Sequence, residues 1–193
     1  MKIKDNRLWW LLIGVFVGVV LGVIAYKSGV DYACPSRICV GSSEIVPVTD
    51  RGYFDQAHKI LSGAKSSIHI VAFELKYYPR NPESLENKIV RDLIYAKQRG
   101  VDVKVIVDEY SQNNNAFDIL RSYGVDVRWD DNQTTTHAKL VVVDGRIVLL
   151  GSTNFSYMAL EQNNEANVLI TDEKTAKYFE EYFQNLWKAN EKP

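Results

Sequence analysis

The chain has 193 residues, of which 46% are hydrophobic and 24% are charged, a composition that excludes an intrinsically disordered or collagen-like protein. This length allows one compact domain with an appendage and leaves too little chain for two full domains. The formal net charge of −1 excludes a broadly basic protein, so any contact with nucleic acid or anionic lipid must come from a local patch.

The first feature along the chain is an uncharged apolar run of 18 residues, from Leu8 to Ala25. A helix of this length is about 27 Å long, close to the hydrocarbon thickness of a bilayer. Residues 8–26 are therefore expected to form an N-terminal transmembrane helix. A secretory signal peptide is the alternative, because a basic segment precedes the run and Val23–Ala25 is a candidate cleavage site.

The basic residues around this run predict its orientation. Lys2, Lys4 and Arg7 precede the run, and only Lys27 follows it closely. The positive-inside tendency therefore puts residues 1–7 in the cytoplasm. The protein is then expected in the cell membrane, crossing it once, with the rest of the chain outside the cytoplasm. Cleavage of the segment would make it a secreted protein instead.

A linker is expected over residues 27–43, and it holds both cysteines of the chain, Cys34 and Cys39. Outside the cytoplasm this short loop can close as a disulfide. Two free thiols are the alternative. A structural zinc site needs four ligands, and no nearby histidine or cysteine supplies the other two.

From residue 44 to residue 193, β-branched runs alternate with helical patterns, which is typical of an α/β sheet with helices on its faces. Helices are expected from Asp50 as cap to Gly63, from about Ser84 to Arg99, over Asn115–Tyr123, and over Glu173–Ala189 with Asp172 as cap. Strands are expected over Glu44–Val48, Ser67–Glu74, Val101–Val107, Val125–Trp129, Leu140–Val143, Ile147–Leu150 and Ala166–Thr171. Asp144-Gly145 predicts a hairpin turn.

Polar residues gather around one of these strands. His137 and Lys139 enter it two positions apart, so strand alternation points both side chains to the same face. The next strand runs into Gly151–Asn154, and Glu165 opens the strand after that. A histidine beside a fixed cation, with neutral donors nearby, suits a phosphate group. A packed imidazole is the usual explanation for a lone histidine, but five polar groups converge here.

One spacing runs through these positions: His137-x-Lys139-x4-Asp144-x6-Gly151-Ser152-x-Asn154. It fills every defining position of the phospholipase D superfamily signature, and the chain resembles that family over roughly residues 44–188. The resemblance is to the short members with a single motif, such as bacterial secreted endonucleases and the membrane-anchored mitochondrial member. It implies a mixed β-sheet sandwiched by helices over residues 44–193.

The resemblance also implies a role for each matching residue. His137 attacks phosphorus and forms a phosphohistidine intermediate. Lys139 and Asn154 hold the non-bridging oxygens, and Ser152 lines the same pocket. Glu165 hydrogen-bonds the imidazole and sets its tautomer.

Two further expectations concern the surroundings of this site. Asp144 either belongs to the site or braces the hairpin. Catalysis in this family needs no metal or other cofactor, and around the motif the sequence has no carboxylate cluster or histidine pair with metal-ligand spacing.

The expected function is that of a membrane-anchored phosphodiesterase, an endonuclease on single-stranded nucleic acid. A phospholipase D acting on lipid headgroups and a non-catalytic interaction protein that retains the fold are the alternatives. The loops over residues 130–136 and 161–164 are polar and slightly acidic, which favours nucleic acid over a membrane surface. Lys76, Arg80 or Arg128 would extend a narrow cationic path from Lys139.

The single motif also predicts a homodimer. Transfer through phosphohistidine needs one histidine to attack and another to protonate the leaving oxygen. The chain contains one His-x-Lys motif and no internal repeat, so a second chain must supply the second copy. A two-fold axis beside the motif would bring the two His137 side chains into one shared active site.

Overall fold

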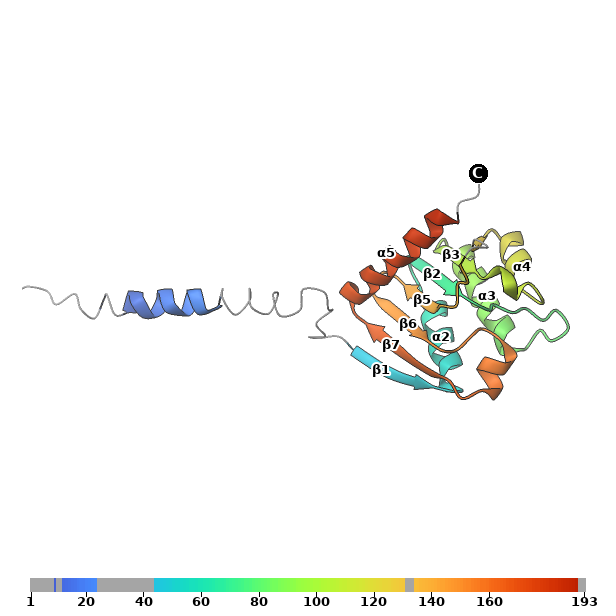
Figure 1. Cartoon of the computed structure of the whole chain (residues 1–193), viewed down its shortest axis with the longest axis horizontal. Coiled ribbons are helices and arrows are strands. Elements are labelled where there is room, and N and C mark those ends of the chain that lie inside the picture. Colours follow the sequence, from blue (N-terminus) through green and yellow to red (C-terminus); the bar gives the residue numbers. More distant parts are fainter. Residues whose placement is uncertain (1–8, 10–11, 24–43, 131–133, 191–193) are drawn as a thin grey trace, which may run out of the picture. The chain divides into compact units, whose positions relative to one another are not determined.

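The computed structural model describes residue 9 and residues 12–23, 44–130 and 134–190 (Figure 1). The chain divides into two compact units, Met1–Gly41 and Ser42–Pro193. The expected cytoplasmic segment of residues 1–7 and the linker of residues 27–43 lie outside the described residues. The pairing of Cys34 with Cys39 therefore stays a prediction.

The first unit contains a helix within the expected anchor. Residues 12–23 are helical and all are exposed. In the part of the chain that the structure describes, no helix has the length and hydropathy required to cross a membrane. The expected anchor over residues 8–26 reaches beyond the described residues at both ends, so it stays a prediction.

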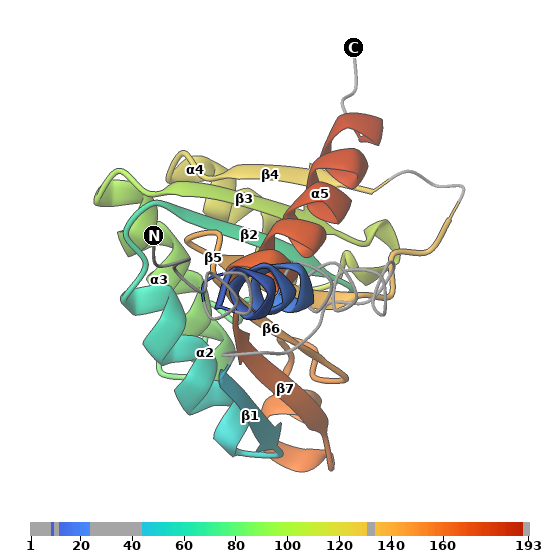
Figure 2. The same cartoon turned by 90° about the vertical axis from the view of Figure 1, so that its left-hand side faces the viewer.

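The described strands of the second unit form one seven-stranded mixed sheet in the order β1-β7-β6-β5-β2-β3-β4 (Figure 2). β2, β3 and β4 are parallel to one another, and every other pair of neighbours is antiparallel. The strands are β1 (Glu44–Thr49), β2 (Ser67–Ala72), β3 (Asp102–Val107), β4 (Asp126–Trp129), β5 (Lys139–Val143), β6 (Ile147–Gly151) and β7 (Ala166–Thr171).

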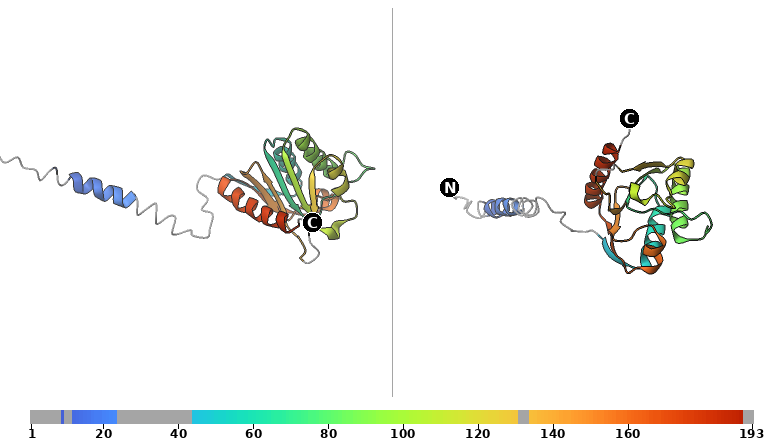
Figure 3. Two further views of the ribbon diagram at one scale, coloured as in Figure 1. Left: turned by 90° about the horizontal axis from the view of Figure 1, so that it is seen from above. Right: turned by 45° about the vertical axis from the view of Figure 1, so that its right-hand side comes forward.

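Helices cover both faces of this sheet, as the views in Figure 3 show. The helices are α2 (Gly52–Ser62), α3 (Leu85–Gln98), α4 (Phe117–Ser122) and α5 (Glu173–Ala189). One core joins buried side chains of α2, α3 and α4 to one face of the sheet. A second core packs Ala176 and Phe183 of α5 against the other face. The expected sandwich of helices around a mixed sheet is confirmed.

Local sequence signals account for most helix boundaries. The side chain of Ser84 accepts a hydrogen bond from the Asn87 N–H at the start of α3, and Asp172 does the same for Thr175 at the start of α5. Gly100 follows α3 with a φ of 90°, a backbone conformation that favours glycine. These boundaries confirm the expected positions to within about two residues.

The expected cap of α2 is wrong. Arg51 occupies the cap position without a side-chain cap bond, and the helix begins at Gly52. The carboxylate of Asp50 instead accepts a hydrogen bond from the Glu165 N–H at 2.8 Å, and the Asp50 N–H donates to the Glu165 carbonyl at 3.0 Å. Asp50 therefore ties the end of β1 to the residue that precedes β7.

The sheet topology brings several chain segments together at the end of the sheet where the parallel strands terminate. We call this end of the sheet the carboxyl edge. The parallel strands β2, β3 and β4 end there. β5 is antiparallel to β2, with Lys139 opposite Ala72, so it begins there. β6 is antiparallel to β5 and ends there at Gly151. Polar side chains in the loops at these five strand ends are thus held on one side of the molecule.

Two short helical elements at this edge were not expected from the sequence. A 3₁₀-helix over Glu109–Ser111 follows β3, and a π-helix over Met158–Gln162 lies between β6 and β7. Each is a single turn, too short to produce a recognisable hydrophobic period. Both lengthen the loops around the carboxyl edge.

Two of the three histidines of the chain lie away from this edge. His69 on β2 is only 5% exposed, stacks on Phe183, and lies with Nδ1 2.7 Å from a carboxylate oxygen of Glu180. His58 is exposed on α2 and pairs with Asp92 at 2.7 Å. Both of these histidines are thus engaged by carboxylates away from the motif, which contains His137.

Candidate active site

His137 and Lys139 form the centre of the candidate site at the start of β5. His137 is exposed, whereas Lys139 is 8% exposed. The Lys139 Nζ atom lies 3.2 Å from each ring nitrogen of His137 and donates to the His137 carbonyl at 2.7 Å. The expectation that both side chains lie together at one face is confirmed.

An aromatic ring supports this pair from β2. Phe73, the residue after β2, lies with its ring centroid 4.6 Å from that of His137 and 5.0 Å from Lys139 Nζ. A cation over a ring face is attracted by the ring quadrupole. Sequence analysis did not identify Phe73 as a site residue, because a phenylalanine in an apolar strand carries no signal beyond packing.

The charges of three carboxylates act on the buried ammonium of Lys139. Burial lowers the pKa of Lys139, and the negative charges of Glu74, Glu165 and Asp108 only partly oppose this effect. These three residues follow or precede three different strands, β2, β7 and β3, at the carboxyl edge. The site therefore places a cation against the exposed histidine while negative charges remain near it.

Ser152 and Glu165 meet on the neighbouring strands. The Ser152 hydroxyl donates to one carboxylate oxygen of Glu165, and the Asn163 amide donates to the other at 3.0 Å. The Ala166 N–H donates to the Ser152 hydroxyl at 3.1 Å. Two residues that are 13 positions apart in the sequence are thus joined, as the adjacency of β6 and β7 requires.

The hydrogen bond expected between Glu165 and His137 is not among the contacts of the described residues. Within a single chain, the carboxylate of Glu165 contacts Ser152 and Asn163 instead. The negative charge of Glu165 also acts on Lys139, where it opposes the lowering of the pKa by burial. A tautomer-setting role for Glu165 therefore stays a prediction.

Asn154 is half-buried and follows Ser152 by two positions in the motif. Its Oδ1 atom and the hydroxyl of Tyr53 are buried, and neither has a hydrogen-bond partner among the described residues. Burial raises the pKa of Tyr53, and the charge of Glu165 raises it further. Leaving a buried polar atom without a hydrogen bond lowers the stability of the folded state by about 1–3 kcal/mol. The site therefore keeps two polar atoms at a cost in folding stability. The phosphate-holding role of Asn154 stays a prediction.

Gly151 is required by close backbone packing. A Cβ atom at this position would lie 2.5 Å from the Ala166 carbonyl oxygen and 2.6 Å from the Cα atom of Asn167. The Asn167 side chain accepts from the Thr153 N–H at 3.2 Å and donates to the Thr153 hydroxyl at 2.8 Å. Asn167 thus fixes the segment that carries Ser152 and Asn154, a role that sequence analysis missed.

Asp144 lies at the other end of β5, five residues from Lys139 and about 17 Å away along the strand. Its carboxylate accepts hydrogen bonds from the N–H groups of Lys65, Ser66 and Ser67 and from the Ser66 hydroxyl, at 2.7–3.1 Å. Partial burial by itself raises the pKa of Asp144, but these hydrogen bonds outweigh it and hold the pKa below its usual value. These hydrogen bonds give Asp144 a structural role, because they hold the hairpin turn against the segment that enters β2.

Among the residues described here, no three His, Cys, Asp or Glu side chains gather in an arrangement that could hold a metal ion. Metal independence is implied by the family resemblance and stays a prediction. The groups gathered at the carboxyl edge are a histidine, a cation, a hydroxyl and an amide, which suit the binding of a phosphodiester and attack on its phosphorus.

Comparison with known proteins identifies the family. The family described as cardiolipin synthase, PLD-like domain, matches residues 58–187, which is more than half of the chain. The chain belongs to the phospholipase D superfamily. This match contains the whole motif from His137 to Asn154, and the expected resemblance is confirmed.

Curated relatives agree with this assignment. The mitochondrial cardiolipin hydrolase of Xenopus tropicalis is 38% identical over 103 residues, which cover 52% of this chain and 49% of that protein. The same enzyme of Xenopus laevis is 32% identical over 146 residues, covering 74% and 64%. A phospholipase D of Rickettsia typhi is 31% identical over 127 residues, covering 65% and 56%. The chain thus spans about half to two thirds of the length of these relatives.

Solved structures share the fold. Nuc from Salmonella typhimurium, a phospholipase D family member, superposes with a TM-score of 0.68 at 27% identity, over 78% of this chain and 97% of Nuc. NucT from Helicobacter pylori gives a TM-score of 0.65 at 21% identity, over 77% and 98%. The superfamily fold therefore covers nearly the whole of these two neighbours.

Proposed function

We propose that this protein is a membrane-anchored phosphodiesterase that acts through a phosphohistidine intermediate and that its substrate is single-stranded nucleic acid. The observation that carries the proposal is the contact between the exposed imidazole of His137 and the buried ammonium of Lys139 at the carboxyl edge. An exposed nucleophile beside a fixed cation matches the attacking and charge-stabilising groups of a phosphoryl transfer.

The proposed reaction has two steps. A ring nitrogen of His137 attacks phosphorus and forms a P–N bond, while the P–O bond to the leaving group breaks. The leaving oxygen takes a proton from a second histidine. Water then attacks phosphorus, returns a proton to that second histidine, and releases His137. Lys139 stabilises the negative charge on the non-bridging oxygens in both steps.

The second histidine is proposed to come from a second copy of the chain. His58 and His69 are engaged by Asp92 and Glu180, away from the carboxyl edge, so neither can serve as the acid in the same chain. A homodimer with a two-fold axis beside the two His137 residues supplies the acid. Sedimentation of the full chain in detergent should give a dimer, and a fully active monomer would exclude this arrangement.

The polarity of the loop before β7 favours nucleic acid as the substrate. Gln162, at the end of the π-helix, and Asn163 and Asn164 after it are exposed and polar, and a strand of nucleic acid requires only a narrow cationic path. The path begins at Lys139. Lys76, which was expected to extend it, is engaged by the Ser111 hydroxyl at 3.0 Å and the Asn113 carbonyl at 2.9 Å.

One observation favours the phospholipid alternative. Tyr157 and Met158 follow the motif and are 45% and 56% exposed, so the candidate site is bordered by apolar as well as polar groups. Exposed aromatic and apolar side chains beside an active site suit docking to a bilayer surface. Several relatives are named as cardiolipin hydrolases.

The deciding experiment offers both substrates to the full chain in detergent. We expect cleavage of single-stranded DNA or RNA that weakens as salt rises, because phosphate contacts release counterions. Double-stranded DNA should be cut more slowly, since its phosphorus must be brought into a recessed dimer site. Release of headgroups from cardiolipin vesicles, with oligonucleotides left whole at low salt, would replace the nuclease assignment with the lipid one.

The membrane anchor and its orientation are part of the proposal. They rest on the uncharged run from Leu8 to Ala25 and the basic residues before it. Protease added to intact cells should digest or release the domain of residues 44–193. Full protection, with digestion only after lysis, would reverse the orientation or place the protein on an internal membrane.

A further inference from the structure

The proposed nucleophile lies in a loop. His137 comes between β4 and β5 and belongs to neither strand. Just after it, the Ala138 carbonyl accepts a hydrogen bond from the Phe73 N–H at 3.1 Å. Just before it, the Thr136 N–H is bound by two carboxylates that the proposed reaction does not involve. A reacting group must be held to within about 0.5 Å, so these backbone contacts decide how His137 is presented.

The two carboxylates are those of Asp108 and Asp130. The Thr136 nitrogen lies 2.8 Å from Oδ2 of Asp108 and 3.1 Å from Oδ2 of Asp130. The two aspartates are 0% and 3% exposed, so water does not compete for these oxygens. A hydrogen bond from an N–H to a carboxylate is about twice as strong as one between neutral groups. The residue before the nucleophile is thus held by a strong bond that two buried side chains share.

The register of the sheet brings these two side chains together. β3 and β4 are parallel, with Val107 opposite Trp129 at their ends. Asp108 and Asp130 are therefore the next pair in this register. The Asp108 N–H donates to the Ala72 carbonyl at 3.1 Å, and the Asp130 N–H donates to the carbonyl of Val107 at 3.0 Å. The backbone ladder thus continues for one residue beyond the strands and carries both carboxylates to the carboxyl edge.

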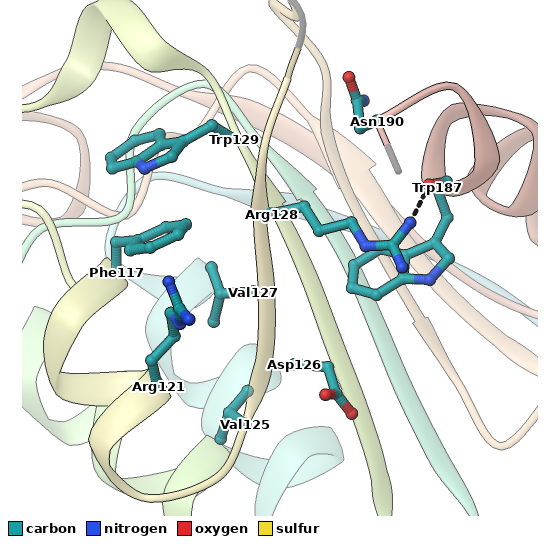
Figure 4. A pocket seen from close by; sticks show the side chains of 9 residues that line it. All are labelled: Phe117, Arg121, Val125, Asp126, Val127, Arg128, Trp129, Trp187 and Asn190. Carbon is teal, nitrogen blue, oxygen red and sulfur yellow. Dashed lines mark hydrogen bonds between the residues drawn. The ribbon is translucent and has the colours of Figure 1, made fainter. Parts of the chain in front are cut away.

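Packing fixes the end of β4 that leads to Asp130. Figure 4 shows the side chains of Trp129 and Arg128 on opposite sides of this strand. Trp129 stacks on Phe117 of α4 with ring centroids 4.4 Å apart. The guanidinium of Arg128 lies 4.0 Å from the ring centroid of Trp187 on α5. Both sides of the strand are packed next to Asp130, so its side chain begins from a fixed backbone.

The other oxygen of each carboxylate binds the 3₁₀-helix that follows β3. Oδ1 of Asp108 accepts a hydrogen bond from the Tyr110 N–H at 2.9 Å. Oδ1 of Asp130 accepts one from the Glu109 N–H at 3.0 Å. Each carboxylate is therefore fixed by a second bond, and its Oδ2 atom stays directed at Thr136. Such support by surrounding hydrogen bonds is what a preorganised site requires.

The pair has an electrostatic cost. Burial raises the pKa of Asp130, hydrogen bonds from Glu109 and Thr136 lower it, and the negative charge of Asp108 raises it again. The net shift is upward, because two carboxylates close to one N–H repel each other. Burying two such groups together contributes little to the stability of a fold. Their shared contact with the residue before His137 gives them a role in the site.

We propose that Asp108 and Asp130 are positioning residues for His137, which act by holding the Thr136 N–H. The proposal rests on the proposed phosphodiesterase function. Because both carboxylates accept from one N–H, either can hold it when the other is removed. The hold therefore fails only when both are lost. A nucleophile displaced by about 1 Å loses about 10²-fold in rate, and the loss falls on kcat because substrate binding is unchanged.

The test measures kcat and KM of the full chain in detergent with bis(p-nitrophenyl) phosphate. This small diester is neither a nucleic acid nor a lipid, so the result does not depend on the choice between them. Asp108→Ala and Asp130→Ala should each lower kcat about threefold, and the double alanine variant about 10²-fold, with KM unchanged in all three. The double asparagine variant keeps oxygens that can accept from Thr136 and should regain about tenfold.

Asp92→Ala is the matched control. Asp92 is 6% exposed and pairs with His58 at 2.7 Å between α3 and α2, away from the carboxyl edge. This variant should have a lower melting temperature and the wild-type kcat at temperatures where it is folded. A loss of kcat as large as that of the double alanine variant would indicate general destabilisation and would overturn the proposal.

Hydrogen exchange of the Thr136 N–H tests the hold without any substrate. Exchange should be slow in the wild type and at least about tenfold faster in the double alanine variant. Slow exchange in that variant, or fast exchange with the wild-type kcat, would overturn the proposal. A wild type that hydrolyses no diester, with exchange as expected, would overturn the phosphodiesterase and support the hold on Thr136.

A second combination of variants applies where the double alanine variant does not fold. Asp108→Asn together with Asp130→Ala leaves one amide oxygen for the Thr136 N–H, and kcat should fall about tenfold with KM unchanged. The wild-type kcat in this folded variant would overturn the proposal.

Discussion

The two ends of β5 carry the two halves of one motif, and they differ in almost every physical respect. At its start, His137 is exposed, and its ring nitrogens lie near the ammonium of Lys139. At its end, the carboxylate of Asp144 receives hydrogen bonds from three consecutive backbone N–H groups and a hydroxyl. One end presents reactive groups, and at the other end the carboxylate is engaged by hydrogen bonds within the chain.

This difference shows how a short signature can combine chemistry with folding. Asp144 joins the β5–β6 turn to the segment that enters β2, so it holds β5 beside β2 in register. That register sets Lys139 opposite Ala72 at the carboxyl edge. Asp144 thus acts on the site only through the position of the strand, and the following predictions test this division.

The largest effect is expected at the start of β5. His137→Asn removes the nucleophile from an exposed position and should lower kcat by at least about 10³-fold while the thermal unfolding curve stays unchanged. Asp144→Asn should retain wild-type kcat at temperatures where it is folded. Wild-type rates in His137→Asn would exclude His137 as the nucleophile and would support the alternative of a non-catalytic protein with this fold.

EDTA should leave the wild-type rate unchanged.

The next effect concerns Lys139. Lys139→Met removes a buried charge that stabilises the phosphoryl oxygens, and kcat should fall about 10²–10³-fold. The protein should remain folded, because the apolar side chain replaces a cation whose burial is unfavourable. Circular dichroism checks the fold and single-turnover kinetics check the rate. A change in KM alone would assign Lys139 to substrate binding rather than to the transition state.

The sequence could predict the strands, which follow from residue patterns, and the catalytic pair, which follows from the motif. The β-branched runs specified the strands, and the motif specified His137 and Lys139 two positions apart on one face. It could not predict that the Phe73 ring packs beside His137 and Lys139, because Phe73 lies 64 residues before His137 in the chain. The close approach of Asn167 to Gly151 depends on the pairing register of β6 and β7, which the residue pattern does not specify. The mistaken cap at Asp50 has the same cause, since its carboxylate is engaged by Glu165, which lies 115 residues later.

At the other end of β5, the expected effect is on stability. Asp144 has a φ of 54°, a conformation that asparagine tolerates, so Asp144→Asn keeps the backbone and removes the charge and one accepting oxygen. We expect a loss of about 2 kcal/mol in the free energy of unfolding. Thermal unfolding of the full chain in detergent measures it. Glu181→Gln, at an exposed position on α5, is the control and should change stability by less than about 0.5 kcal/mol.

The smallest effect is the pH dependence of that loss. The hydrogen bonds to Asp144 hold its pKa in the folded protein below that of the unfolded chain. The stabilisation is therefore present above the unfolded pKa of about 3.9 and is lost as the pH falls through the folded value. The difference in unfolding free energy between the wild type and Asp144→Asn should be constant from pH 7 to about pH 5 and should shrink below about pH 4. Other carboxylates titrate equally in both proteins and cancel in this difference. A gap that stays constant down to pH 3 would mean that the shape of the side chain, rather than its charge, braces the hairpin.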